Sequence, residues 1–261
     1  MTSRALHLEN RAVIRLTGAD VRKFLQGLVT NDVMKAVPGA AVYSALLTPQ
    51  GKFMYDMIIM ADGDDLLLDV EAERKDELVR RLTMYKLRAD VTITGESGLK
   101  VWAVWTDAEP EGIAVADPRD ASLGYRVISA EMPGAAPLAF ADYESKRLAL
   151  GIPDGSRDME VEKYFWLETD AERLNGVSFS KGCYVGQELT ARMKHRTALK
   201  KKLVAVKAEG GTLTAGQQIT AENGKSAGEI RTTDGTNAIA YFRLEFTDAT
   251  LNAGGTSITL A

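Results

Sequence analysis

The sequence contains few of the residues that bind metals or form disulfides. It has one cysteine, Cys183, and two histidines, His7 and His195, in 261 residues. A single cysteine excludes an intrachain disulfide and the paired-cysteine motifs of zinc and cluster sites, and it suits a reducing compartment. Because an iron–sulfur cluster normally takes four cysteine ligands, one copy of this chain cannot supply them alone. We therefore expect no tightly bound metal in the isolated chain.

Long apolar runs are also missing. The first residues, MTSRALHLENRAVIRL, lack the apolar stretch of a secretory signal and reach a strand-like pattern almost at once. A mitochondrial presequence is not recognisable, and no run is long enough to span a membrane. These absences predict a bacterial cytoplasmic protein that has no membrane partner.

The chain has no excess of positive charge. It carries 32 Lys and Arg against 36 Asp and Glu, for a net charge of −4, so nucleic acid is not an expected partner. No P-loop, GxGxxG motif or hydrolase triad is visible. Hydrophobic residues make up 45% and charged residues 26%, which is typical of a globular protein with a substantial core.

Hydrophobic periodicity predicts an α+β fold. Residues 11–16 alternate as a strand, and the segment after them places Val21, Phe24, Leu25 and Leu28 on one helical face. Further strands are expected at 41–47, 53–60, 66–70 and 89–94, with an amphipathic helix at 72–88. Strand, helix, several strands, helix and strand is the order of a ferredoxin-like unit.

A second unit and a β domain follow. Strand patterns at 100–105, 112–116 and 124–128 and a helix at 140–150 predict a shorter α+β unit, whereas short strands between Gly, Asn and Asp turns dominate from Leu203 onward. We therefore expect an α+β region over residues 1–196, with sub-domains of about 1–95 and 96–196. A small C-terminal β-barrel is expected over residues 197–261.

Residues 181–196, KGCYVGQELTARMKHR, contain the cysteine and end in a helical pattern. A lysine and a helix N-terminus are surroundings that lower a cysteine pKa, and the thiolate is the reactive form. This makes Cys183 and Lys181 the candidate catalytic residues. A lone cysteine near glycine is also common as a small packed side chain, so its role stays open between transient cluster ligand, nucleophile and structural element.

This segment resembles the signature K-G-C-[FY]-x-G-Q-E-x-x-[AS]-R of the folate-binding YgfZ family, which is related to the glycine cleavage T protein, an aminomethyltransferase. The similarity is greatest to the branch with the mitochondrial assembly factor for [4Fe-4S] proteins. Every fixed place of the signature is filled, from Lys181 to Arg192. The resemblance implies ferredoxin-like sub-domains of the T-protein type, a C-terminal barrel, and a tetrahydrofolate-binding accessory factor that works with iron–sulfur assembly proteins and their client enzymes.

The same resemblance implies the folate site. Glu168 falls on the place of the glutamate that holds the pterin ring, and a carboxylate accepts two charge-assisted hydrogen bonds from such a ring. The T-N-D segment lies near the folate cavity in the family. The other implied binding residues, taken from that segment and from the signature, are Asn31, Asp32, Tyr184, Gln187, Glu188 and Arg192.

Two alternatives remain. The first is a one-carbon transferase, which needs a carboxylate beside the transferred amine. The family has two aspartates for this purpose, and their places are taken here by Tyr55 and Asp56, so only one carboxylate is kept. An accessory role in tRNA modification would depend on six cations, Arg192, Lys194, Arg196, Lys200, Lys201 and Lys202. Such a cluster also suits the glutamyl tail of a folate, an acidic partner or a solvated linker.

Overall fold

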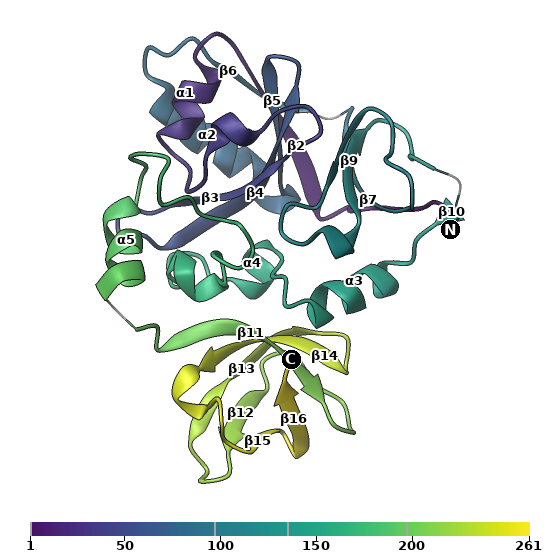
Figure 1. The fold of residues 1–261 in the computed structure, drawn as a ribbon, viewed down its shortest axis with the longest axis vertical. Coiled ribbons are helices and arrows are strands. Elements are labelled where there is room, and N and C mark those ends of the chain that lie inside the picture. Colours follow the sequence, from purple (N-terminus) through teal and green to yellow (C-terminus); the bar gives the residue numbers. More distant parts are fainter. Residues whose placement is uncertain (1, 97, 135, 197) are drawn as a thin grey trace.

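The computed structural model describes residues 2–96, 98–134, 136–196 and 198–261. Across these residues the strands form two five-stranded sheets and one closed six-stranded barrel (Figure 1). The two sheets lie side by side in the upper part of Figure 1, and the barrel lies below them. The predicted α+β fold with a C-terminal β-barrel is therefore confirmed.

The first sheet has the order β3-β4-β5-β2-β6, with antiparallel neighbours. Its elements are β2 (Arg11–Thr17), α1 (Val21–Gln26), η1 (Val33–Lys35), β3 (Val42–Leu47), β4 (Phe53–Asp62), β5 (Asp65–Glu71), η2 (Ala72–Arg74), α2 (Lys75–Lys86) and β6 (Thr92–Glu96). Successive residues of β4 join different cores: Met57 and Ile59 pack on the helix side, and Ile58 and Met60 on the other. Because both faces are covered, β4 is apolar along most of its length.

One predicted strand begins too early. We expected a strand at 89–94, but β6 begins at Thr92. The residues before it form a turn in which Leu87 has a positive φ of 48° and the Asp90 backbone exchanges hydrogen bonds with Asp20. These contacts join the end of α2 to the start of α1, so strand pairing begins only after them.

The second sheet has the order β10-β1-β7-β9-β8. Its elements are β1 (Arg4–His7), β7 (Lys100–Trp105), β8 (Ile113–Ala116), η3 (Ala121–Leu123), β9 (Tyr125–Ser129) and β10 (Ala136–Pro137), and helix α3 (Phe140–Ala149) follows them. Strand β1 pairs with β7, almost 100 residues away, so the chain begins in the second sheet and then builds the first. The predicted boundary between sub-domains near residue 95 stays a prediction. Strand β1 precedes this boundary in the sequence but pairs with β7, which follows it.

A segment of short helices connects the sheets to the barrel. It contains α4 (Gly155–Asp158), η4 (Trp166–Thr169) and α5 (Gln187–Arg196). In Figure 1 α4 and α5 lie between the sheets and the barrel. The barrel consists of β11 (Lys201–Ala208), β12 (Gln218–Ala221), β13 (Ser226–Thr233), β14 (Asn237–Arg243), η5 (Leu244–Phe246), β15 (Leu251–Ala253) and β16 (Thr256–Leu260). Alternate residues of β14 face different ways, because Ala240 and Phe242 fill the barrel whereas Ile239 and Tyr241 pack on the sheets.

None of the helices in the described part of the chain is both long and apolar enough to cross a membrane.

Candidate functional site

Cys183 lies on the surface, in the loop that precedes helix α5. Both Cys183 and the neighbouring Gly182 are exposed, and Gly182 has a positive φ of 99°. The next residue, Tyr184, is buried and holds the loop against the protein. The Cys183 thiol is therefore exposed to solvent, although the loop that carries it packs against the protein through Tyr184.

Lys181 attaches the loop to helix α1. Its Nζ donates hydrogen bonds of 2.6 Å to the carbonyl oxygens of Gln26 and Val29, and it lies 5.3 Å from the ring centroid of Tyr184. A lysine at the carboxyl end of a helix satisfies carbonyls that have no intrahelical partner. Burial lowers the pKa of Lys181 to about 8. Among the described residues Lys181 makes no ion pair or hydrogen bond with Cys183, so its visible contacts are those of an anchor.

Two glycines bring the loop against the turn between β3 and β4. Gly186 has a positive φ of 84°, and a Cβ there would lie 2.6 Å from the Thr48 oxygen and 3.1 Å from the Gly51 Cα. A side chain is also disfavoured at Gly51, because a Cβ on it would lie 3.2 Å from the Gly186 oxygen. That oxygen also accepts a hydrogen bond of 3.0 Å from Thr190 Oγ1, which closes the first turn of α5. Only glycine permits this approach of two backbones.

The T-N-D segment lies beside the signature loop. Gln26 Nε2 donates to Asp32 Oδ1 at 3.0 Å and to the Lys181 carbonyl at 3.4 Å, so one side chain bridges the two motifs. Asp32 also caps η1 by accepting a hydrogen bond from the Met34 amide. The structure thus places Asp32 close to Lys181, although 149 residues separate them.

Asn31 borders a cleft of about 380 Å³. The cleft is lined by Asn31, Lys35, Ala41, Val42, Tyr43, Pro118, Glu172, Asn175, Val177 and Ser178. The amide of Asn31 is already engaged, because its Nδ2 donates to the carbonyls of Tyr43 and Asn175 at 2.9 and 2.6 Å and its Oδ1 accepts from the Asp32 amide. Trp166 does not line the cleft, but it donates to the carbonyl of Gly176, which lies between the lining residues Asn175 and Val177, at 2.9 Å.

Glu168 lies at the contact between the sheets and the barrel. Its Oε2 accepts hydrogen bonds from the Phe165 amide at 3.1 Å and from the Tyr241 hydroxyl at 3.0 Å. The Tyr241 ring stacks on Tyr164 with centroids 4.0 Å apart, and burial together with the nearby Glu168 raises the pKa of Tyr241 well above its usual value. Glu168 is therefore not among the residues that line the cleft beside Asn31.

The remaining predicted binding residues are on helix α5. Gln187 is half-buried, and Glu188 and Arg192 are exposed. The cations that follow are partly neutralised, since Lys194 pairs with Glu172 and Lys202 Nζ lies 2.6 Å from Asp170 Oδ1.

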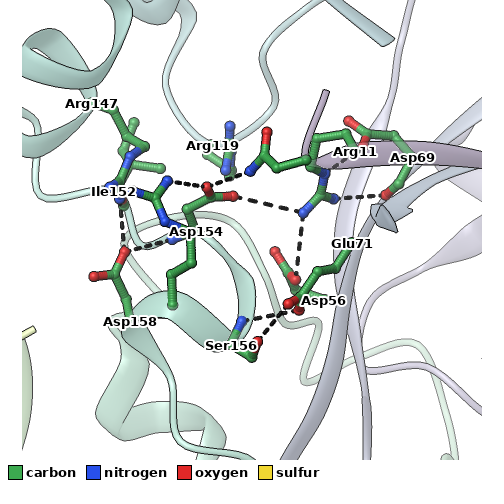
Figure 2. Close-up of polar contacts among 12 residues, drawn as sticks. Arg11, Asp56, Asp69, Glu71, Arg119, Arg147, Ile152, Asp154, Ser156 and Asp158 are labelled. Carbon is green, nitrogen blue, oxygen red and sulfur yellow. Dashed lines mark hydrogen bonds and ion pairs between the residues drawn. The ribbon is translucent and has the colours of Figure 1, made fainter. Parts of the chain in front are cut away.

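A network of buried charges was not predicted from the sequence. Arg11 is buried where the two sheets meet, and its guanidinium is surrounded by three carboxylates (Figure 2). Its nitrogens lie 2.6 Å from Asp69 Oδ1, 3.8 Å from Asp56 Oδ1 and 3.9 Å from Asp154 Oδ1. These acids pull the pKa of Arg11 above its usual value although burial alone would lower it.

A second buried arginine extends this network toward the barrel. Arg147 is 1% exposed and pairs with Glu144 at 2.7 Å and Asp158 at 2.8 Å. Asp158 and Arg147 both bond the hydroxyl of Thr232 on strand β13. On the second sheet, Arg126 of β9 lies 3.5 Å from Asp69 Oδ2. The charges therefore connect both sheets, α3, α4 and the barrel. Their signal in the sequence is a single charge within an apolar strand, as at Asp56 in FMYDMIIM and Asp69 in LLLDV.

Asp56, the carboxylate needed by the transferase alternative, is enclosed in this network. Its side chain is 1% exposed, burial raises its pKa, and the Tyr43 hydroxyl donates to its Oδ2 at 3.4 Å. No hydrogen bond reaches its Oδ1 from the described residues. Within the same residues no group of three or more His, Cys, Asp or Glu side chains is arranged to hold a metal ion.

Comparisons with known proteins agree with this architecture. Residues 7–119 match the GCVT N-terminal domain model, and residues 200–261 match the CAF17 C-terminal beta-barrel domain model. The human mitochondrial iron-sulfur cluster assembly factor IBA57 is 30% identical over 269 residues, which cover 89% of this chain and 75% of that protein. The chain belongs to the IBA57 family. The mouse member is 34% identical over 91% of this chain and 77% of its own length, and the Coccidioides immitis homolog is 33% identical over 77% and 56%.

A solved structure shows the same fold at a much lower sequence identity to this chain. The glycine cleavage system aminomethyltransferase T from Bartonella henselae superposes with a TM-score of 0.79 at 13% identity, over 99% of this chain and 85% of that one. The resemblance to the T-protein-like fold and to the assembly-factor branch is thus confirmed. The predicted bacterial cytoplasmic location is wrong by the same comparison, because these IBA57 relatives are named as mitochondrial proteins.

Proposed function

We propose that this chain is an accessory factor in the assembly or repair of iron–sulfur proteins, and that Cys183 is its reactive or ligating group. Relatives at 30% identity and above carry this role in their names. The observation that carries the proposal is the exposed thiol on an anchored loop. A buried cysteine would serve packing, whereas an exposed one can reach a cluster held by another protein.

The cluster is cargo in this proposal, and its other ligands come from partners. The chain has one cysteine, and its described residues contain no metal-binding group. One thiolate from Cys183 fills one of the four cysteine places that a cluster normally needs. The partners are therefore iron–sulfur assembly proteins and client enzymes that bring the remaining ligands.

The test is rescue of a [4Fe-4S] enzyme. Cells that lack this protein are complemented with wild type, Cys183→Ala or Ser180→Ala, and aconitase activity is measured at equal protein levels. Ser180 is exposed in the same loop and is the matched control. We expect wild type and Ser180→Ala to restore activity and Cys183→Ala to leave it at the level of the deletion. Full rescue by Cys183→Ala would show that the thiol is not needed.

Folate binding is the second part of the proposal, and the residues fit it in part. A cleft of about 380 Å³ is in the range of small-molecule sites, and it has both apolar walls and polar groups. Glu168 keeps one carboxylate oxygen, Oε1, without a hydrogen-bond partner from the described residues. We propose that this oxygen contacts the pterin. Because Glu168 does not line the cleft beside Asn31, the pterin contact and the cleft are separate parts of the proposed site. Asn31, Asp32, Tyr184, Gln187, Glu188 and Arg192 remain proposed contributors, with Asn31 and Asp32 shaping the backbone beside the cleft.

Tetrahydrofolate titration tests Glu168, with the fluorescence of Trp102, Trp105 and Trp166 as the signal. We expect Glu168→Gln to weaken binding by about 1.5 to 3 kcal/mol, the scale of a hydrogen bond to a charged group. Tyr241→Phe removes the bond between Glu168 and the barrel but keeps the carboxylate, so it should leave affinity within about twofold. Equal losses in both variants would assign Glu168 to the barrel contact instead of the pterin.

A further inference from the structure

A cationic pocket lies at the edge of the barrel, next to its contact with the sheets. Its volume is about 450 Å³. It is lined by Leu199, Lys200, Lys201, Arg243, Leu244 and Glu245. Its walls come from the start of β11, the end of β14 and η5, and the amide of Leu244 donates to the Lys200 carbonyl at 2.9 Å. This bond fixes the two sides of the pocket relative to each other.

The pocket contains an unfavourable arrangement of charge. Lys201 and Arg243 are directly opposite each other in the antiparallel pair of β11 and β14. Side chains at such positions lie on the same face with Cβ atoms about 5 Å apart, and like charges there are destabilising. Lys200 adds a third cation. The acid in the pocket, Glu245, pairs with Arg243 Nη2 at 2.6 Å and leaves the lining with an excess of two positive charges.

The position of this pair ties it to the contact between barrel and sheets. Lys201 and Arg243 continue the outward rows of Leu203 and Tyr241, which pack on the sheets. The Lys201 ammonium is 5.4 Å from the ring centroid of Tyr241. In Figure 1 these strands form the upper side of the barrel, which faces the sheets, and α3 packs on both of them. The strands that carry the cations thus lie at the boundary between two parts of the molecule, and the three cationic side chains are exposed there.

We propose that this pocket binds a small polyanion that carries two or more neighbouring phosphate or carboxylate groups. An anion placed between Lys201 and Arg243 turns their repulsion into two attractions, and a second anionic group reaches Lys200. A single chloride carries one negative charge, so it would leave part of the positive excess of the lining uncompensated. Leu199 and Leu244 supply apolar wall beside the charged groups, so the ligand has an uncharged portion as well. The site uses different residues from those of the proposed assembly role.

The experiment is calorimetric titration of the full chain with pyrophosphate and with citrate, at an ionic strength kept constant with sodium chloride. We expect one saturable site. The double variant Lys201→Gln, Arg243→Gln should weaken binding at least tenfold. Lys207→Gln, which removes an exposed lysine from the same strand outside the pocket, should leave it unchanged. Glu245→Gln should tighten binding severalfold because it removes the competing carboxylate.

A stability measurement separates this role from a structural one. Without ligand, Lys201→Gln should melt at the same temperature as wild type or higher, since a like-charge pair is relieved. Pyrophosphate or citrate should raise the melting temperature of wild type but not that of the double variant. The anion that binds more tightly identifies the source as phosphate or carboxylate.

Three results overturn the proposal: absence of saturable binding of both anions to wild type, unchanged affinity in the double variant, or an equal loss in Lys207→Gln. Cys183→Ala should bind the anions as wild type does. Failure of the assembly role and failure of this site are therefore seen in separate experiments.

Discussion

Lys181 shows how one side chain of the signature works at the residue scale. Its ammonium joins the loop before Cys183 to the carbonyls of Gln26 and Val29. Replacement by methionine keeps the aliphatic stem but leaves these carbonyls without a donor. We expect Lys181→Met to lower the free energy of unfolding by about 1 to 2 kcal/mol, measured by urea denaturation at pH 7. Lys194→Met, which removes an exposed ion pair with Glu172, should cost less than about 1 kcal/mol.

The pH dependence of stability provides a further check on Lys181. Burial lowers its pKa from 10.5 in the unfolded chain to about 8 in the folded one. Between these values the unfolded chain binds the additional proton, so this group makes stability rise with pH across that window. The free energy of unfolding of wild type minus that of Lys181→Met should therefore increase from pH 8 to pH 10. A flat or falling difference would show that the Lys181 ammonium is not desolvated in the folded chain. Equal losses in Lys181→Met and Lys194→Met at pH 7 would contradict the anchoring role.

At the scale of elements, the junction of α5 with the β3–β4 turn depends on Gly186. A Cβ at this position meets the Thr48 oxygen at 2.6 Å, whereas one at Gly63 meets nothing within 4 Å. Both glycines have a positive φ, 84° and 61°. Gly63→Ala should therefore cost about 1 kcal/mol for backbone strain alone, and Gly186→Ala about 3 kcal/mol or more because the loop must also move. Thermal unfolding of the two variants measures the difference, and similar costs would show that the close approach is not tight.

At the scale of the whole molecule, the buried charges hold the two sheets and the barrel together. Arg11 and Arg15 are both on β2, and each faces three carboxylates. The Arg11 side chain is 5% exposed, but that of Arg15 is 23% exposed. We expect Arg11→Met to cost about 3 to 5 kcal/mol, because it removes a partner of several buried carboxylates and, among the described residues, leaves Asp69 with Arg126 alone, at 3.5 Å.

Arg15→Met is the matched control for this network and should cost about 1 kcal/mol or less, because water screens its partners. Both values come from urea unfolding. The double variant Arg11→Met, Asp69→Asn should recover part of the loss, since the nearest buried charge is then removed as well. Equal costs at the two arginines would mean that the central network does not join the parts of the fold.

The sequence by itself determined the local elements and the family. Periodicity at 11–16, 72–88 and 203 onward depends on which face of an element is apolar, and this is a property of neighbouring residues. The signature at 181–192 is likewise a local string, so adjacent residues are enough to match it. Asp56 and Asp69 stand out in the sequence as single charges within apolar strands. The sequence did not predict which residues they pair with.

The tertiary structure alone decided which distant residues meet. It placed β1 in the second sheet, Lys181 on the end of α1, Glu168 against Tyr241 and Arg11 among its three acids. Each of these contacts joins residues that are tens to more than a hundred positions apart. Their energies depend on burial and on distances of a few ångströms, and both arise only when separate elements pack together.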